Sequence, residues 1–427
     1  MARIKLEPLR GFRDILEPES RILSRLAEIF AELARKHGYE EVKPPTLERF
    51  EIFAIKAGEE IRRSMYVFMD KAGREVALRP EATASIARIY LKHLRGRPKP
   101  IRLYYIVNCF RYEEPQRARY REFWQAGVEL LGAPGIEADF EVIKLLIAFY
   151  RAIGFLEDIV LKIGTTRLYR ILFAKHSVPE DLQDHILHLM DKSLYDQALE
   201  ELKTRNYKQL ETLLRQLWSH RNEPEKVREI LLESGHQDVA AAVDELTRLI
   251  SMLSSYEPTL RIEPDLAFAR GLAYYTGVIF EVKVPGFPVS IAGGGRYDKL
   301  ISIYGDEDVP GTGFAIGLDR TLAALMDKKK LSVTASEEKK AIIIVLSENL
   351  LPYAAKVQDL LPSNFKAPVT VTKKLQKALA RAAKQGIDHA IIIGEKEAKN
   401  NKVVVKNMKI REQQEIPLDK LPEQLRP

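Results

Sequence analysis

Residues 102–129 read RLYYIVNCFRYEEPQRARYREFWQAGVE, and this stretch decides the fold. The part up to Phe110 is rich in β-branched and aromatic residues, which favour strands. A charged stretch, 111–121, follows, and a second apolar run extends from Phe123 to Glu129. Strand, polar loop and strand is the pattern of a hairpin, so the sequence predicts two antiparallel strands joined by a basic loop.

The loop of this hairpin is predicted to bind phosphate groups. It contains four arginines: Arg111, Arg117, Arg119 and Arg121. A triphosphate is best held by several planar, always-charged donors, and arginine provides these as forked pairs. Phe123 follows the loop, where an aromatic ring could cover an adenine. The alternative is a basic hairpin that only faces solvent.

Two further segments carry side chains suited to a small charged ligand. In LRPEAT (78–83), Glu81 directly follows a proline at the end of an apolar strand, where its carboxylate could hold an ammonium group. In ARGLAYYTG (269–277), Arg270 stands beside a glycine, and Tyr274 and Tyr275 form a pair. Each segment also has a structural explanation, because helix N-termini favour Glu and aromatic pairs pack in strands.

Glycines mark two more segments. In AGGGRYD (292–298), three glycines after a predicted strand would let the backbone approach a ligand closely. Their spacing matches neither a Walker A loop nor a dinucleotide fingerprint. In GTGFAIGLDR (311–320), small residues lead into a helix predicted to begin near Gly313, which would carry Arg320 within two turns. A tight turn and a glycine-rich helix start are the structural alternatives.

Hydrophobic periodicity outside these segments predicts a mixed chain. Apolar residues at helical spacing predict helices over 18–37 and 136–153. Consecutive prolines at 44 and 45 interrupt a short strand that begins after Gly38. Further short strands are predicted at 159–162, 266–268, 278–284 and 289–292.

The region 166–256 is Leu-rich and helical in pattern, which predicts a helical insertion inside the mixed domain. Within it, SVPE (177–180) has the pattern of a helix capping box. A charged linker, 328–340, precedes apolar strands at 341–346 and 390–394 that alternate with helices. This alternation predicts a separate C-terminal domain whose sheet is covered on both faces.

Composition narrows the class of protein. A chain of 427 residues suggests two to four domains, and its mean hydropathy is -0.21. The single cysteine, Cys109, cannot form an intramolecular disulfide and is expected to be a small buried side chain. No run reaches the ~20 apolar residues of a membrane helix, and no leader pattern begins the chain, so a cytoplasmic protein is expected. The net charge of +7 mildly favours a polyanionic partner.

In this order, the segments resemble the histidyl-tRNA synthetase family of class II aminoacyl-tRNA synthetases. Residues 38–48 are similar to class II motif 1, 111–129 to motif 2 and 311–320 to motif 3. Residues 270–277 and 292–298 are similar to two sequences peculiar to the histidine-specific branch. The resemblance implies an α+β fold, in which helices flank an antiparallel sheet, with a helical insertion and a C-terminal α/β domain of the anticodon-binding type.

The resemblance also implies domain limits, substrates and partners. The catalytic core would comprise residues 1–165 and 257–330, the insertion 166–256 and the anticodon-binding-type domain 339–427. The implied reaction is ATP-dependent activation of histidine to histidyl-adenylate, followed by transfer to the terminal adenosine of tRNA(His). ATP with Mg2+, L-histidine and tRNA(His) would be the ligands of a homodimer that binds no membrane. The protein ligands of the magnesium ion are left open.

Each site residue receives a role from the resemblance. Arg111 and Arg320 would contact the α- and γ-phosphates of ATP. Arg270, with Arg111, would be catalytic, holding the histidine carboxylate against the α-phosphate during attack. The remaining ATP-binding residues would be Glu113, Arg119 and Phe123, with Arg121 adding positive charge nearby. The histidine-binding residues would be Glu81, Thr83, Gln125, Glu129, Arg270, Tyr274, Tyr275 and Tyr297. Gln116 would meet the acceptor end of the tRNA.

Three positions depart from the usual family pattern. Ala273 stands where most members have Asp, Glu114 where many have Arg, and Trp124 where His or Tyr is common. These departures leave two alternatives open: a non-catalytic paralogue that serves as a regulatory subunit of ATP phosphoribosyltransferase, and an RNA-binding module without turnover. The presence of all three implied arginines and of the C-terminal domain favours the enzyme.

Overall fold

A computed structural model describes residues 5–54, 62–269, 274–330, 339–362 and 364–425. The chain divides into two units, Met1–Thr334 and Ala335–Pro427, which are described separately. Arg270 and Ala273 lie outside the described residues.

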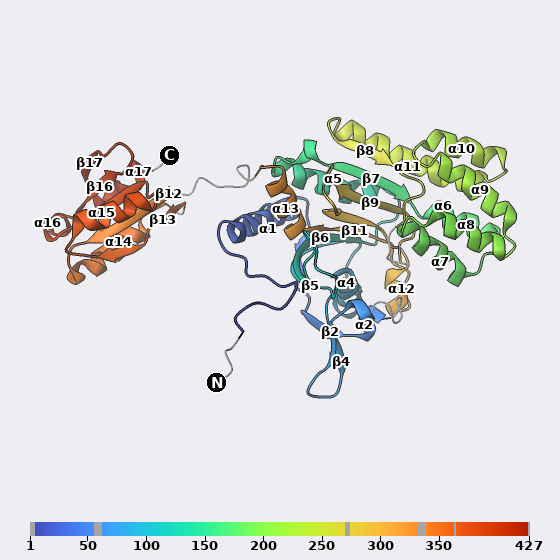
Figure 1. Cartoon of the computed structure of the whole chain (residues 1–427), viewed down its shortest axis with the longest axis horizontal. Coiled ribbons are helices and arrows are strands. Elements are labelled where there is room, and N and C mark those ends of the chain that lie inside the picture. The colour runs from blue at the N-terminus through green and yellow to red at the C-terminus, as the bar shows by residue number, and fades with distance from the viewer. Residues whose placement is uncertain (1–4, 55–61, 270–273, 331–338, 363, 426–427) are drawn as a thin grey trace. The chain divides into compact units, whose positions relative to one another are not determined.

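The first unit is built on an eight-stranded sheet (Figure 1). Adjacent strands from β5 to β7 in the sheet order run antiparallel, and each edge adds a parallel strand, β1 or β8. In sheet order the strands are β1 (Glu40–Glu41), β5 (Ile101–Phe110), β6 (Glu122–Leu131), β11 (Gly311–Gly317), β10 (Ala292–Arg296), β9 (Val278–Lys283), β7 (Val160–Thr165) and β8 (Arg261–Pro264). The predicted hairpin is confirmed, because β5 and β6 pair from Ile101 opposite Leu131 to Phe110 opposite Glu122.

The two faces of this sheet differ in what covers them. One face is buried under helices α1 (Glu19–Lys36), α5 (Ile136–Ala152) and α13 (Leu318–Asp327). The opposite face meets α4 (Thr83–Ile89) and α12 (Leu300–Tyr304) over part of its area. Side chains alternate between the faces along a strand, as the period of two requires: Ala126, Val128 and Leu130 of β6 join the first core. Gln125, Gly127 and Glu129 therefore face the other way.

A small sheet adjoins α4. It consists of β2 (Leu47–Arg49), β4 (Glu75–Leu78) and β3 (Val67–Met69), in that order, beside helix α2 (Glu51–Ala54). Pro44 and Pro45 lie between β1 and β2, so the interruption predicted for this strand is confirmed.

Consecutive helices fill residues 167–256 (Figure 1, green to yellow). They are α6 (Arg167–Lys175), α7 (Glu180–Asp191), α8 (Tyr195–Thr204), α9 (Lys208–Ser219), α10 (Pro224–Glu233) and α11 (Gln237–Tyr256). Their leucines join the same apolar core as the helix-covered face of the large sheet. The chain leaves the sheet at β7, forms these helices and returns at β8.

The second unit is an α/β domain with a six-stranded sheet. Ile343 and Ile391 contribute to one core and Ile342 and Ile392 to another, so both faces of the sheet are covered, as predicted. Its elements are β12 (Lys339–Val345), α14 (Leu351–Asp359), β13 (Phe365–Lys366), β14 (Val369–Val371), α15 (Leu375–Lys384), β15 (His389–Ile393), α16 (Glu395–Lys399), β16 (Lys402–Asn407), β17 (Gln413–Pro417) and α17 (Leu421–Gln424).

Two predictions about glycine-rich segments are wrong. Residues 311–317 form strand β11 rather than the start of a helix, and the helix begins at Leu318. The three consecutive glycines at 293–295 lie inside strand β10 instead of following a strand. Glycine has little preference for strands, but β11 lies between β6 and β10, and both neighbours supply the hydrogen bonds that hold it extended.

Two smaller predictions also fail. Residues 266–268 form no strand, because the chain bends there directly after β8. The predicted capping box at 177–180 is absent, because α7 begins at Glu180 with Pro179 at its cap and no side-chain cap hydrogen bond. Ser177 instead has a φ of 54°, which turns the chain between α6 and α7.

The glycines at the centre of the sheet generate a prediction. A Cβ on Gly294 would lie 2.1 Å from the Gly313 carbonyl oxygen and 2.7 Å from the Phe314 Cα, both backbone atoms of β11. Gly294→Ala should therefore lower the free energy of unfolding by about 3 kcal/mol or more, as severe overpacking does. Urea unfolding followed by tryptophan fluorescence measures this, because both tryptophans, Trp124 and Trp218, lie in the first unit.

Gly96→Ala is the matched control, because its Cβ would meet nothing within 4 Å. Its unfolding free energy should stay within about 0.5 kcal/mol of the wild-type value. Equal unfolding midpoints for the two variants would contradict this account of the sheet.

Candidate active site

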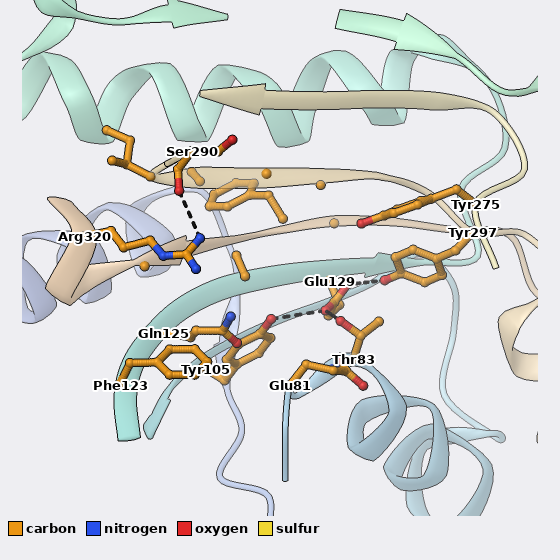
Figure 2. Close-up of a pocket in the computed structure, with 18 of the residues that line it drawn as sticks. Glu81, Thr83, Tyr105, Phe123, Gln125, Glu129, Tyr275, Ser290, Tyr297 and Arg320 are labelled. Carbon is orange, nitrogen blue, oxygen red and sulfur yellow. Dashed lines mark hydrogen bonds between the residues drawn. The ribbon is translucent and has the colours of Figure 1, made fainter. Parts of the chain in front are cut away.

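A pocket of about 760 Å³, counting space open to solvent, lies on the less covered face of the large sheet (Figure 2). Strands β5, β6, β10 and β11 contribute to it, and so does the chain entering α4. Ten of the predicted site residues line it: Glu81, Thr83, Arg111, Phe123, Gln125, Glu129, Tyr274, Tyr275, Tyr297 and Arg320.

Glu129 is the buried centre of one end of the pocket. Its carboxylate accepts hydrogen bonds from the Thr83 hydroxyl at 2.8 Å and the Tyr105 hydroxyl at 3.4 Å (Figure 2). The Tyr297 hydroxyl donates a further hydrogen bond to its other oxygen. Burial raises the pKa of Glu129 to about 8, although the hydroxyl donors act in the opposite direction. This buried carboxyl group can share a hydrogen bond with a polar ligand, and a positive charge brought by a ligand would favour its ionised form.

Glycines make room for this carboxylate. Gly313 is the cross-strand partner of Glu129, and a Cβ there would lie 2.0 Å from a Glu129 carboxylate oxygen. A Cβ on Gly127 would lie 2.5 Å from the Tyr105 hydroxyl oxygen. The glycine-rich composition of β11 therefore has a local cause: larger side chains would displace the acid and the tyrosine that form the pocket floor.

Glu81 lies near Glu129 and caps helix α4. Its carboxylate accepts hydrogen bonds from the backbone N–H groups of Thr83, at 2.5 Å, and Ala84, at 3.0 Å. Burial raises the pKa of Glu81, and those backbone donors oppose the rise. Glu81 thus lies at a helix N-terminus, as the structural explanation requires, and the same contacts fix its carboxylate beside the pocket.

Three tyrosines line the other side of this end. Tyr275 and Tyr297 are 8% and 3% exposed, and Tyr274 packs against both, with ring centroids 5.1 and 6.1 Å away. Burial raises the pKa values of Tyr274 and Tyr297 well above the ordinary value, so both phenols stay protonated. This end of the pocket therefore combines two carboxyl groups with several hydroxyl groups.

A buried ion pair holds Tyr297 in place. Arg296, next in the chain, is 7% exposed and lies 3.0 Å from the carboxylate of Asp139, which is 1% exposed. Arg296 also contacts the Asp298 carboxylate at 3.0 Å, and Asp298 accepts the Gly311 N–H at 3.3 Å. These contacts tie the end of β10 to α5 and to the start of β11. Neither Asp139 nor its role was predicted from the sequence.

The opposite end of the pocket carries arginine and aromatic side chains. Arg111 follows β5, donates to the Pro80 carbonyl at 3.0 Å, and lies 5.4 Å from the centroid of the Phe123 ring. Arg320, in the first turn of α13, donates to the Ser290 carbonyl at 3.1 Å (Figure 2). Two cations from different elements suit an anionic group, and the half-buried ring of Phe123 offers an apolar surface to a base.

Gln125 lies on β6 between the two ends, and Cys109 fixes its orientation. The Cys109 thiol donates to the Gln125 side-chain oxygen at 3.2 Å. Burial raises the pKa of Cys109 to about 12, which keeps the thiol protonated and able to donate. The expectation that Cys109 is a small buried side chain is confirmed, and its position under the pocket is an addition to it.

Four residues predicted near ATP or tRNA are not among those that line the pocket: Glu113, Gln116, Arg119 and Arg121. Arg121 donates to the Glu113 carbonyl at 3.1 Å, within the hairpin loop. Glu113 lies within 4.0 Å of Arg111 and 3.9 Å of Arg119, so it links two arginines of the loop. Gln116 and Arg119 form an isolated antiparallel bridge in the turn of the hairpin. Glu114, one of the departures, forms an exposed ion pair with Arg10 at 2.8 Å. Arg270 lies outside the described residues.

Sequence reasoning missed two hydroxyl-bearing residues that line the pocket, Tyr105 and Ser290. Tyr105 lies on β5 directly opposite Gly127 of β6. Side chains along a strand alternate between its two faces. The predicted hairpin therefore already places Tyr105 on the same face of the sheet as Val107. Ser290 lies in the turn between β9 and β10, and no pattern in the sequence marks it.

Comparisons with known proteins agree with this arrangement. A family model described as "Histidyl-tRNA synthetase" matches residues 11–321, and one described as "Anticodon binding domain" matches residues 340–426. The chain is 42% identical over 424 residues to a protein named "Histidine--tRNA ligase" from Saccharolobus solfataricus, with 97% of each chain covered.

Two solved structures share the fold. One is histidyl-tRNA synthetase from Nostoc sp. PCC 7120, at a TM-score of 0.75 and 24% identity, covering 99% of each chain. The other, from Bacillus halodurans, is titled as an ATP phosphoribosyltransferase regulatory subunit/histidyl-tRNA synthetase. Its TM-score is 0.73 at 24% identity, and the match covers 92% of this chain and 99% of that one.

The sheet, its pocket and the C-terminal domain together define an aminoacyl-tRNA synthetase. Within that class, the matched family model covers most of the chain, and the relative in Saccharolobus is similar over nearly its full length. The chain belongs to the histidyl-tRNA synthetase family.

The pKa of Glu129 generates a prediction for the ligand-free protein. Its ordinary value is 4.5 and its folded value is about 8, so between these pH values the folded state keeps a proton that the unfolded state loses. The stability contributed by this protonated group is full below about pH 4.5 and is lost as the pH rises through 8. Relative to Glu129→Gln, the wild type should lose a few kcal/mol of unfolding free energy between about pH 5 and pH 8.

Urea unfolding at a series of pH values, followed by tryptophan fluorescence, measures this difference. Glu263→Gln, which changes an exposed carboxylate on β8, is the control and should show no comparable trend. A difference between wild type and Glu129→Gln that is constant with pH would contradict the burial argument.

Proposed function

We propose that this protein is a histidine–tRNA ligase, which activates histidine with ATP and transfers it to tRNA(His). The observation that carries the proposal is the two-ended pocket. An acid and hydroxyl end suits an amino acid with a polar side chain, and an arginine and phenyl end suits a nucleotide. Family membership and the near full-length relatives named "Histidine--tRNA ligase" support the same reaction.

The acid end is proposed to read histidine. An imidazole presents one donor and one acceptor at neutral pH, so Glu129 would accept its N–H while the phenol of Tyr275 or Tyr297 serves the other nitrogen. Glu81 and Thr83 would hold the α-ammonium group, and Gln125 would border the side chain. A buried site with several fixed polar groups rejects amino acids that leave those groups unpaired.

The other end is proposed to bind ATP. Phe123 would stack on the adenine, and Glu113 would accept a hydrogen bond from its amino group. Arg111 and Arg320 would contact the α- and γ-phosphates, with Arg119 and Arg121 adding positive charge. Arg270 is proposed, with Arg111, to stabilise the charge that develops as the histidine carboxylate attacks the α-phosphorus and pyrophosphate leaves.

Magnesium is proposed to arrive with ATP. In the part of the chain that the structure describes, no group of three or more His, Cys, Asp or Glu side chains is arranged to hold a metal ion. Mg2+ in nucleotide sites is held largely by phosphates and water, with one or two carboxylates. The ion would neutralise phosphate charge, while the arginines orient the triphosphate.

The second unit is proposed to bind tRNA(His), as the anticodon-binding match suggests. Helix α15 packs Leu379 and Ala382 against its sheet and leaves a basic face exposed. Residues on or beside that face include Lys373, Lys374, Lys377, Arg381 and Lys384. Such a face favours RNA phosphates. Gln116, in the hairpin turn, is proposed to meet the acceptor end.

The remaining proposals concern domains, assembly and location. The limits 1–165, 166–256, 257–330 and 339–427 are proposed as functional divisions. A homodimer is proposed because apolar side chains of the small sheet are exposed: Leu47, Phe68 and Met69. No helix among the described residues is long and apolar enough to cross a membrane, and we propose a cytoplasmic location.

The regulatory-paralogue alternative is less supported. The Bacillus structure that bears the double title shares the fold at 24% identity, whereas relatives at 42% identity over nearly the full chain carry the ligase name. The C-terminal match to an anticodon-binding model also fits an enzyme that handles tRNA.

Histidine-dependent exchange of labelled pyrophosphate into ATP tests the proposed function. Wild-type protein should support exchange with histidine and with no other amino acid, and Arg270→Ala should abolish it. Glu81→Gln should raise the histidine KM, and Arg320→Ala should raise the ATP KM. Each variant loses one charge-assisted contact, so each rise should be roughly tenfold to a hundredfold. Arg228→Ala, which removes a surface ion pair with Asp244, is the control and should change neither. Absence of exchange by folded protein with magnesium would refute the proposal.

A further inference from the structure

The segment between β8 and the tyrosine pair connects the insertion to the pocket. It leaves β8 at Pro264 and is described as far as Ala269, and the description resumes at Tyr274. Leu266, Ala267 and Ala269 are at most 3% exposed although they form no strand. A buried segment without regular structure must find partners for its backbone groups elsewhere.

The helical insertion supplies those partners. The Tyr169 hydroxyl, on α6, donates to the Leu266 carbonyl, and Trp218 on α9 donates its indole N–H to the Tyr169 hydroxyl at 2.9 Å. The Leu266 N–H in turn donates to the Arg221 carbonyl, after α9, at 2.7 Å. Both backbone groups of Leu266 are thus satisfied by the insertion.

Neighbouring residues of the segment are held in the same way. The Tyr195 hydroxyl, on α8, donates to the Ala267 carbonyl at 3.4 Å, and its ring lies 5.3 Å from Trp218. The Asn222 side-chain amide donates to the Pro264 carbonyl at 2.7 Å. Side chains from α6, α8 and the α9–α10 connection therefore converge on one stretch of backbone.

The first residue of the insertion contacts the tyrosine pair itself. Thr166, the cap of α6, donates its N–H to the Gly277 carbonyl at 2.9 Å. Its hydroxyl lies 3.3 Å from the Tyr275 carbonyl and 3.2 Å from the Gly277 carbonyl. The insertion thus holds the chain on both sides of residues 270–273, and Tyr275 lines the pocket.

The insertion is less basic than the chain as a whole. Residues 167–256 contain 12 Lys and Arg and 15 Asp and Glu, a net charge of -3 in a chain whose total is +7. Proteins that bind nucleic acid through its phosphates concentrate positive charge on the binding part.

We infer that the helical insertion positions the amino-acid end of the pocket, with Tyr169, Tyr195 and Thr166 as positioning residues. Their hydroxyl groups bond to the backbone of 264–269 and 275–277, and thereby hold Tyr275 in the wall of the pocket. This inference rests on the proposed function, since it assigns these residues to histidine binding. The nucleotide end, formed by Arg111, Phe123 and Arg320, does not depend on these contacts.

Pyrophosphate exchange without tRNA tests the inference through separate KM values. Tyr169→Phe and Thr166→Val each remove one hydroxyl and should raise the histidine KM several-fold, with the ATP KM unchanged. Tyr195→Phe, at a half-buried site, should also raise the histidine KM. It replaces either of the other variants if that variant fails to fold. A role in stability alone would not separate the two KM values.

Tyr207→Phe is the matched control. Its hydroxyl donates to the Ser177 carbonyl at 3.4 Å, a contact entirely within the insertion, so neither KM should change. An unchanged histidine KM in the test variants, a parallel rise of both KM values, or an equal shift in the control would overturn the inference. Wild-type protein without exchange would instead overturn the proposed function on which the inference rests.

Discussion

The buried carboxyl group of Glu129 is the constraint on which the rest of this pocket depends. An acid on the face of a sheet needs hydrogen-bond donors and space, and both are costly to provide in a protein interior. Thr83, Tyr105 and Tyr297 provide the donors from three different elements. Gly313 provides the space across the strand pair. The glycine-rich strands, the tyrosines and the capping of α4 by Glu81 are therefore parts of one arrangement rather than independent motifs.

This arrangement suits one sheet to the two proposed ligands. Its central strands present small residues toward the pocket, so a ligand can lie close to the backbone, while polar groups stand at either end. The end around Glu129 is neutral to acidic, and the end around Arg111 and Arg320 is basic. An amino acid and a nucleotide can thus meet over the glycines with their reacting groups adjacent, which is how positioning contributes to catalysis. The insertion also contributes to this arrangement, because its hydroxyl groups donate hydrogen bonds to the backbone on the tyrosine side of the pocket.

Much of the fold could be predicted from the sequence, since apolar periodicity marks the hairpin, the long helices and the two-faced sheet of the second unit. The glycine-rich strands could not, because strand β11 owes its conformation to β6 and β10 rather than to the preferences of its own residues. For the site, the family resemblance singled out Glu81, Glu129 and Arg320, and all three line the pocket. Tyr105, Asp139 and Ser290 were missed because their roles come from cross-strand register and long-range packing, which no local pattern contains.

A crystal structure of the complex with histidine and a non-hydrolysable ATP analogue tests the central claim most directly. We expect an imidazole nitrogen within about 3 Å of the Glu129 carboxylate, the α-ammonium group on Glu81, and the triphosphate between Arg111 and Arg320. Histidine bound elsewhere, or with its imidazole directed away from Glu129, would contradict the account.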